Sequence, residues 1–309
     1  MPDVILRAMG EGDRNEVADL ICVSTNFWYR ASGKPAIFAA GPAACLLFCD
    51  VYEALDPGCC VVAEDPATRR LMGSCFYHPR ETHVSLGIMN VHPNYFGGGV
   101  AGRLLRFMTD LADRDGKPTR LVSSAMNLDS FSLYTRAGFV PVAAFQDMVI
   151  DSPPEQADFV GSLAGRVRTA RAEDLPAICD LEWRVSHIRR EKDYRHFVAN
   201  PEGIWHLSVF EGDRGIVDGF LASVAHPGSN MLGPGVATSD EVAEALILAE
   251  LRHHRGRRPV FLVPADRPRL VRRMYELGAR NLEIHFCQVR GRFDPFDGVV
   301  MPTFMPETG

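Results

Sequence analysis

The sequence lacks the features that mark membrane, secreted or metal-binding proteins. It has no apolar run near the roughly 20 residues that a membrane-spanning helix needs, and its first residues have neither the basic start nor the apolar core of a secretory signal. Its eight cysteines include no C-x-x-C pair and mostly lie in apolar surroundings. We therefore expect a cytoplasmic protein with buried free thiols and no metal.

A strong overall charge is also missing. The net charge is -6 over 309 residues, with 46% hydrophobic and 23% charged residues, a composition typical of soluble globular proteins. Association with nucleic acid is therefore not expected. One local exception is a run of arginines from Arg252 to Arg273, opposed only by Asp266. A solvated helix face and loop account for it, and the alternative is a docking surface for an acidic partner or nucleic acid.

The length exceeds what one hydrophobic core usually organises and predicts two domains. Residues 151–165, DSPPEQADFVGSLAG, carry adjacent prolines, acids and glycine and are typical of a linker. After them the chain begins again, because the pattern Leu6-Arg-Ala-Met followed by Gly12-Asp13 resembles Val167-Arg-Thr-Ala followed by Glu173-Asp174. We predict domains at 1–150 and 166–309, each starting with a short strand and an amphipathic helix.

Hydrophobic periodicity in the first half predicts alternating strands and helices. The expected strands lie near residues 3–8, 59–64, 70–78, 82–91, 120–125 and 140–150, and the expected helices near 11–25, 42–55, 99–115 and 129–137. This order indicates an α/β fold with a mixed sheet and helices packed on it.

A glycine cluster follows the strand that ends near Val91 and opens the helix near Gly99. Glycines let backbone N–H groups approach an anion closely, and a helix N-terminus adds unpaired donors and the positive end of its dipole. Arg103 adds a cation one turn into the helix. The cluster therefore indicates a phosphate site, although a flexible turn would have the same composition.

Two motifs together resemble the GNAT superfamily of acyl-CoA-dependent N-acyltransferases. The segment from Phe96 to Ala101 is similar to the acyl-CoA loop Q/R-x-x-G-x-G/A, with Phe96 in place of the polar first residue. The segment from Asn127 to Phe139, NLDSFSLYTRAGF, is similar at every specified position to N-x-x-A/S-x-x-L-Y-x-K/R-x-G-F. The resemblance covers roughly residues 4–150 and implies two tandem GNAT-like domains, since the second half looks like a diverged copy.

The resemblance implies acetyl-CoA or CoA as co-substrate, without a metal, and a small-molecule or peptide amine as acceptor. It assigns Tyr134 as the catalytic acid that protonates the departing thiolate, whereas an isolated tyrosine at this spacing would pack between helix and sheet. It implies an acyl-CoA site formed by Met89, Asn90, Val91, Gly97, Gly98, Gly99, Val100, Ala101, Gly102, Arg103, Asn127, Ser130 and Tyr134.

The general base is left open, because the strand before the loop has no carboxylate where many family members carry Glu. Glu81, His83 and His92 are the nearby candidates, and an amine that arrives neutral or loses its proton through water is the alternative. The aromatic and apolar segments 26–30 and 36–40 are predicted to form the acceptor side, although core packing explains them as well.

In the second half the junction at Asn230–Asp240 has no glycine triplet, and Pro234 removes a backbone donor. The helix near 267–278 has Met274 where the first half has Tyr134, with Tyr275 about 100° further round the helix. We therefore expect this half to be non-catalytic. An N-acetyltransferase is the favoured function, and a non-catalytic CoA-binding module that signals through a partner is the alternative.

Overall fold

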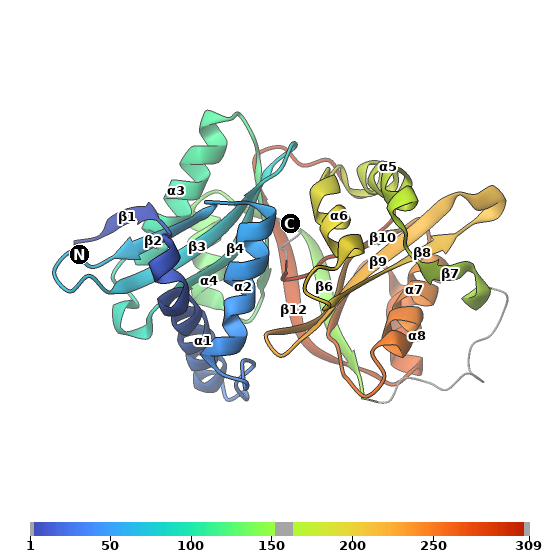
Figure 1. Ribbon diagram of the computed structural model, residues 1–309, viewed down its shortest axis with the longest axis horizontal. Helices are drawn as coiled ribbons and strands as arrows, with labels where there is room; N and C mark the ends of the chain where they lie inside the picture. The colour runs from blue at the N-terminus through green and yellow to red at the C-terminus, as the bar shows by residue number, and fades with distance from the viewer. Residues whose placement is uncertain (1–2, 152–162, 306–309) are drawn as a thin grey trace.

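The structure, a computed structural model, describes residues 3–151 and 163–305. Figure 1 shows two lobes side by side, the first half of the chain in one and most of the second half in the other. Most of the predicted linker, residues 152–162, lies outside the described residues. In the part that is described, no helix has the length and apolar character needed to cross a membrane.

The elements of the first half confirm the predicted order, with ends that differ by a few residues. α1 is the main exception, because it continues six residues past the predicted end at residue 25. The side chain of Asn26 exchanges hydrogen bonds with the backbone of Phe38, which holds this last part of the helix against the following loop. The elements are β1 (Ile5–Ala8), α1 (Arg14–Ala31), α2 (Pro42–Leu55), β2 (Cys60–Glu64), β3 (Leu71–Pro79), β4 (Val84–Val91), α3 (Val100–Arg114), β5 (Thr119–Ser124), α4 (Leu128–Arg136) and β6 (Val140–Ile150).

The second half repeats the first down to individual ion pairs. Arg7 forms two hydrogen bonds of 2.6 and 2.9 Å to Asp13, and Arg168 forms two of 2.7 and 2.8 Å to Asp174. The predicted repeat is therefore confirmed. The elements are β7 (Val167–Thr169), α5 (Leu175–Ser186), α6 (Glu191–Ala199), β8 (Trp205–Glu211), β9 (Val217–His226), β10 (Ser229–Ala237), α7 (Asp240–His253), β11 (Phe261–Pro264), α8 (Pro268–Glu276), β12 (Ala279–Arg290) and β13 (Val299–Met301).

The two halves exchange a strand. The larger sheet has the order β1-β2-β3-β4-β5-β12-β6-β11, so β12 of the second half lies between β5 and β6 of the first, and β6 lies between β12 and β11. The smaller sheet has the order β13-β10-β9-β8-β7 and meets the larger one through a parallel bridge from Met231 to Val260. Figure 1 shows β6 and β12 together between the lobes.

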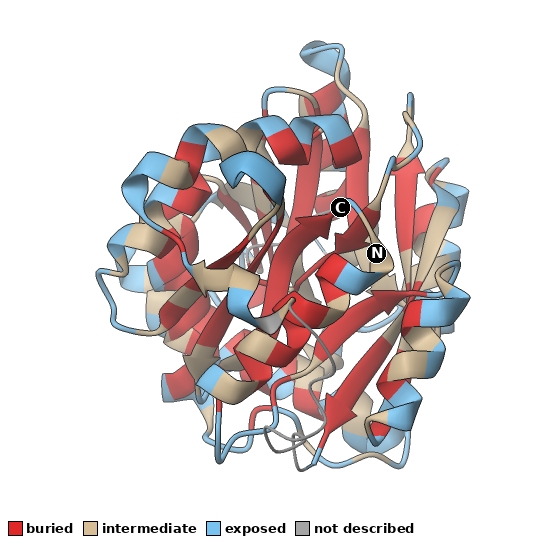
Figure 2. Ribbon diagram, turned by 90° about the vertical axis from the view of Figure 1, so that its right-hand side faces the viewer, coloured by how far each residue is buried: buried red, intermediate tan, exposed pale blue. Residues whose placement is uncertain are grey.

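Helices cover both faces of the part of the larger sheet that the first half of the chain forms. One core cluster joins α3 and α4 to the sheet through residues such as Leu104, Met108 and Tyr134. On the opposite face, α1 and α2 share a cluster with residues of the second half, including Tyr194 and Phe220. In Figure 2 the strands are buried over most of their length, whereas the helices alternate between buried and exposed residues, the pattern of amphipathic helices around a central sheet.

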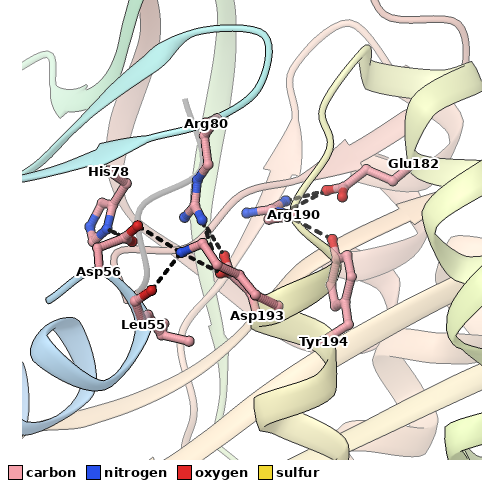
Figure 3. A network of polar contacts seen from close by, with 9 residues as sticks. Leu55, Asp56, His78, Arg80, Glu182, Arg190, Asp193 and Tyr194 are labelled. Carbon is pink, nitrogen blue, oxygen red and sulfur yellow. Dashed lines mark hydrogen bonds and ion pairs between the residues drawn. The ribbon is translucent and has the colours of Figure 1, made fainter.

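A buried network of charges joins the halves (Figure 3). Arg80, at the end of β3, pairs with Asp193 of α6 at 2.8 Å, and both side chains are at most 1% exposed. Lys192 donates to the Asp56 carboxylate at 2.7 Å, and Asp56 also contacts the His78 ring at 2.8 Å. Since burying unpaired charges is costly, these pairs fix how the second half sits on the first.

Candidate functional site

The strands β4 and β5 separate and leave an opening in the sheet. They run parallel and pair only where they start, at Val84 with Thr119 and Ser85 with Arg120. Beyond these pairs the last residues of both strands, 88–91 and 122–124, are half-buried rather than fully covered. The opening therefore lies between the carboxyl ends of two adjacent strands.

One wall of the opening is a strand edge with free backbone groups. The His92 N–H donates to the Met72 carbonyl at 2.8 Å, which directs the backbone of His92 toward β3. Because backbone groups alternate along an antiparallel ladder, those of Asn90 also point toward β3, and those of Met89 and Val91 point into the opening. An extended ligand with amide groups could pair with this edge.

The glycine loop lies at the end of this edge and presents unpaired donors. Gly97 and Gly99 have φ angles of 75° and 80°, a left-handed conformation that favours glycine. Within the described residues, no hydrogen bond engages the N–H groups of Gly97, Gly99, Val100, Ala101 and Gly102. Arg103 has no ion pair among those residues either. The loop therefore has the donors and the free cation that a phosphate needs.

Phe96, the departure from the family pattern, packs against the first helix. Its ring is 51% exposed and lies edge-on to the ring of Phe27 in α1, with centroids 5.7 Å apart. Phe27 also lines an open groove of about 590 Å³ beside α1, together with Cys22, Val23, Asn26, Arg30, Ala31 and Pro42. Of the predicted acceptor segments, 26–30 therefore reaches a groove, whereas Phe38 in the segment 36–40 is buried.

α4 places Tyr134 on the face of the sheet that carries α3. Asn127 caps this helix, accepting a hydrogen bond from the Ser130 N–H at 3.1 Å. Tyr134 is buried in the core cluster that includes Met89 and Val91 of the strand edge. Burial raises the pKa of the Tyr134 hydroxyl, the Cys75 thiol adds to the rise, and a hydrogen bond with Ser130 opposes it. The phenol therefore keeps its proton at neutral pH and is available as a donor.

Two of the three candidates for the general base, Glu81 and His83, lie away from the opening. Glu81 lies on the exposed β3–β4 turn, 3.7 Å from Arg189. His83 is buried at the opposite end of β4, where burial and nearby guanidinium groups lower its pKa far below the usual value. His92 follows β4, but its Nδ1 accepts the Asn94 N–H at 3.2 Å.

A cluster of acids and a histidine on the α1 face was not anticipated. Glu283 and His285 of β12 lie beside Ser124 of β5 and Asp147 of β6. The Ser124 hydroxyl donates to Glu283 at 2.8 Å, and the His285 ring contacts Asp147 at 2.8 Å. Sequence reasoning missed these residues because no local pattern reveals that β12 inserts next to β5.

In the second half the equivalent opening is filled. β10 meets the start of β11 at the bridge from Met231 to Val260, just as β4 and β5 pair where they start. There, however, β13 pairs with β10 from Gly235 to Ala237 on the side away from β9. Its backbone occupies the edge that remains free in β4.

The helix that follows β10 is also poorly suited to an anion. Ser239 caps α7 by accepting the Val242 N–H at 3.3 Å, and the first turn carries Asp240 and Glu241. These acids already complement the helix dipole. Met274 is fully buried in the core, and the exposed Tyr275 donates to Gln146 at 2.6 Å.

Part of the arginine-rich segment is compensated by neighbouring acids. Arg258 pairs with Asp151, and Arg269 pairs with Glu241. Arg273 lies 2.8 Å from Glu244. These pairs agree with a solvated face.

Comparison with known proteins identifies the class. Residues 27–139 match the family model "Acetyltransferase (GNAT) family". No curated protein gives a significant sequence match. The chain is similar over its full length to solved structures of low sequence identity, and such likeness shows the fold alone.

A proposed acetyltransferase from Pyrococcus horikoshii has a TM-score of 0.75 at 14% identity, covering 99% of this chain and 96% of that one. A GCN5-related N-acetyltransferase from Sphaerobacter thermophilus has a TM-score of 0.64 at 19% identity, covering 96% and 98%. A tandem GNAT protein from the clavulanic acid biosynthesis pathway has a TM-score of 0.63 at 15% identity, covering 94% and 100%.

The first half of the chain thus belongs to the GNAT superfamily. The whole chain has the tandem form of the fold, in which two GNAT-like domains follow each other.

Proposed function

We propose that the first half transfers an acetyl group from acetyl-CoA to an amine. The observation that carries the proposal is the combination of an open β4 edge with five unpaired N–H groups at the glycine loop. These groups match the two parts of the co-substrate, since the edge can pair with the pantetheine amides and the loop can hold the pyrophosphate. In the described part of the second half, β13 covers the corresponding edge and acids stand in the first turn of the corresponding helix.

In this proposal the amine nitrogen attacks the thioester carbonyl, a C–N bond forms, and the C–S bond breaks. Tyr134 gives its proton to the departing sulfur. Burial keeps the Tyr134 hydroxyl protonated until that moment, because ionisation in the apolar core is unfavourable. The remaining rate enhancement comes from holding two already reactive groups together.

Two measurements test the proposal. Calorimetric titration with acetyl-CoA should give one equivalent per chain, because β13 fills the second opening. Release of free thiol should then appear with at least one member of a library of primary amines. Binding without thiol release from any amine would favour a CoA-responsive module instead, and absence of binding would refute both functions.

Tyr134→Phe tests the assigned acid. We expect unchanged acetyl-CoA affinity and a turnover lower by about 10²–10⁴-fold, the usual contribution of a general acid. Tyr275→Phe is the matched control, since this tyrosine lies in the equivalent helix of the second half and is exposed. Equal turnover in the two variants would remove Tyr134 from the mechanism.

A further inference from the structure

We infer that His285, oriented by Asp147, is the general base that takes the proton from the acceptor amine, and that the second half therefore completes the first half's active site. This inference rests on the proposed function and names a residue for a role that it leaves open. Both side chains are buried, with side-chain exposures of 8% and 7%.

The position of the cluster follows from α1, which crosses the opening in the sheet. Near its middle, the Thr25 hydroxyl accepts a hydrogen bond of 3.2 Å from Asn90 of β4. Beyond its end, Lys34 donates to Glu283 of β12 at 2.8 Å. α1 and the loop after it therefore extend across the opening, and the β12 cluster lies on the side opposite Asn90, one strand beyond β5.

The levels along the strands agree with this placement. Ser85 of β4 is level with Arg120 of β5, and β4 carries one extra residue between Leu86 and Met89, so Asn90 is level with Ser124. Ser124 is the register partner of His285 across the β5–β12 ladder. His285 thus lies at the height of Asn90, where the opening is already formed.

The dyad has the geometry of an oriented base. The Nδ1 of His285 lies 2.8 Å from the Asp147 carboxylate, which favours a proton on Nδ1 and leaves Nε2 as the acceptor. No hydrogen bond engages Nε2 within residues 3–151 and 163–305. The Phe304 ring packs against the imidazole with centroids 4.5 Å apart and adds an apolar wall.

The charges around the dyad suit a cationic acceptor. Asp147 and Glu283 are register partners, an arrangement that costs stability because like charges face each other across a ladder. Lys34 and Tyr29 of the α1 region are titratable groups that face the same cluster. An ammonium group arriving here would meet two carboxylates, so we expect the acceptor to be a primary amine that is protonated in solution.

The proton balance is complete without a further reactant. The acceptor ammonium gives one proton to His285 Nε2, which passes it to solvent, and the freed lone pair attacks the thioester. The nitrogen loses a second proton as the tetrahedral adduct collapses. That proton replaces the one that Tyr134 has given to the sulfur, so the products are the amide, CoA thiol and one solvent proton.

The test compares His285→Gln with His206→Gln in turnover of acetyl-CoA with the amine that releases thiol fastest. His206 is the matched control, because its Nδ1 also lies 2.9 Å from a buried carboxylate, that of Glu250 in the second half. We expect wild type and H206Q to turn over acetyl-CoA at the same rate. H285Q should lose about 10²–10⁴-fold at neutral pH and recover as the pH rises and the amine itself becomes neutral. An unchanged rate of H285Q at neutral pH would overturn the inference.

A second measurement does not depend on turnover. In protein labelled with ¹⁵N-histidine, the His285 resonances are assigned as those that disappear in H285Q. Acetyl-CoA should shift these resonances and leave those of His206 in place. Unshifted His285 signals with acetyl-CoA bound would place the imidazole away from the acetyl group and refute the role. Failure of the proposed function is distinguishable, since it would appear in the wild type as absent binding or absent thiol release.

Discussion

Removing the carboxylate of Asp193 should be one of the most destabilising single changes at the junction of the halves. The side chains of Asp193 and Arg80 are 0% and 1% exposed and lie 2.8 Å apart. Asp193→Asn keeps the shape but leaves a buried guanidinium without its counter-charge, which typically costs about 3–5 kcal/mol. The nearby Lys192 ammonium, 3.4 Å from Asp193, loses an acid as well.

Urea unfolding followed by circular dichroism measures the effect. The control is Glu191→Gln, which removes an exposed ion pair with Arg195 on the same helix and should cost less than about 0.5 kcal/mol. The double variant Arg80→Met with Asp193→Leu should recover most of the loss, because it removes both charges together. The reasoning is refuted if Asp193→Asn unfolds at the same urea concentration as Glu191→Gln.

Two further predictions concern acid and the exchanged strands. Burial disfavours the charged Asp56 carboxylate, yet its hydrogen bond to His78 and the charges of His78 and Arg80 lower its pKa to about 2. At about 1.4 kcal/mol per pH unit, the lowered pKa of Asp56 stabilises the fold by about 2 kcal/mol above pH 4. This stabilisation is lost as the pH falls from about 4 to about 2. Asp56→Asn should therefore approach wild-type stability as the pH falls through this range, and a constant difference would contradict the assignment. Fragments 1–151 and 163–309 should each fail to fold alone and should recover structure when mixed, because β12 and β6 each complete the other fragment's sheet; a stably folded first fragment would disprove this.

The local signals in the sequence were enough for the elements of the first half. α2 was predicted and found at residues 42–55, where Pro42 follows a glycine of positive φ and sets the first turn. The repeat was visible because Arg7 with Asp13, and Arg168 with Asp174, recur at the same spacing. Such features depend on neighbours a few residues apart.

The order of the strands depends on partners far apart in sequence, and the sequence did not reveal it. Ser124 and Glu283 are hydrogen-bonded although 159 residues separate them. The candidates for the base, Glu81, His83 and His92, are therefore residues near the glycine loop in sequence. Which side chains lie near the opening is decided instead by the register of the strands. The acyl-CoA residues assigned by resemblance lie around one opening, and their role in binding stays a prediction.

The strand exchange gives a physical reason why the diverged second half is retained. Filling the second opening with β13 satisfies the β10 edge and removes one possible acyl-CoA site. The same half donates β12, which closes the gap between β5 and β6 and carries Glu283 and His285 to the first opening. A second half that bound no co-substrate would thus still be required for transfer, because it supplies the imidazole of His285 that Asp147 of the first half orients. On this argument, changes in β12 should alter the acceptor reaction without altering acetyl-CoA affinity, a separation that a purely structural second half would not produce.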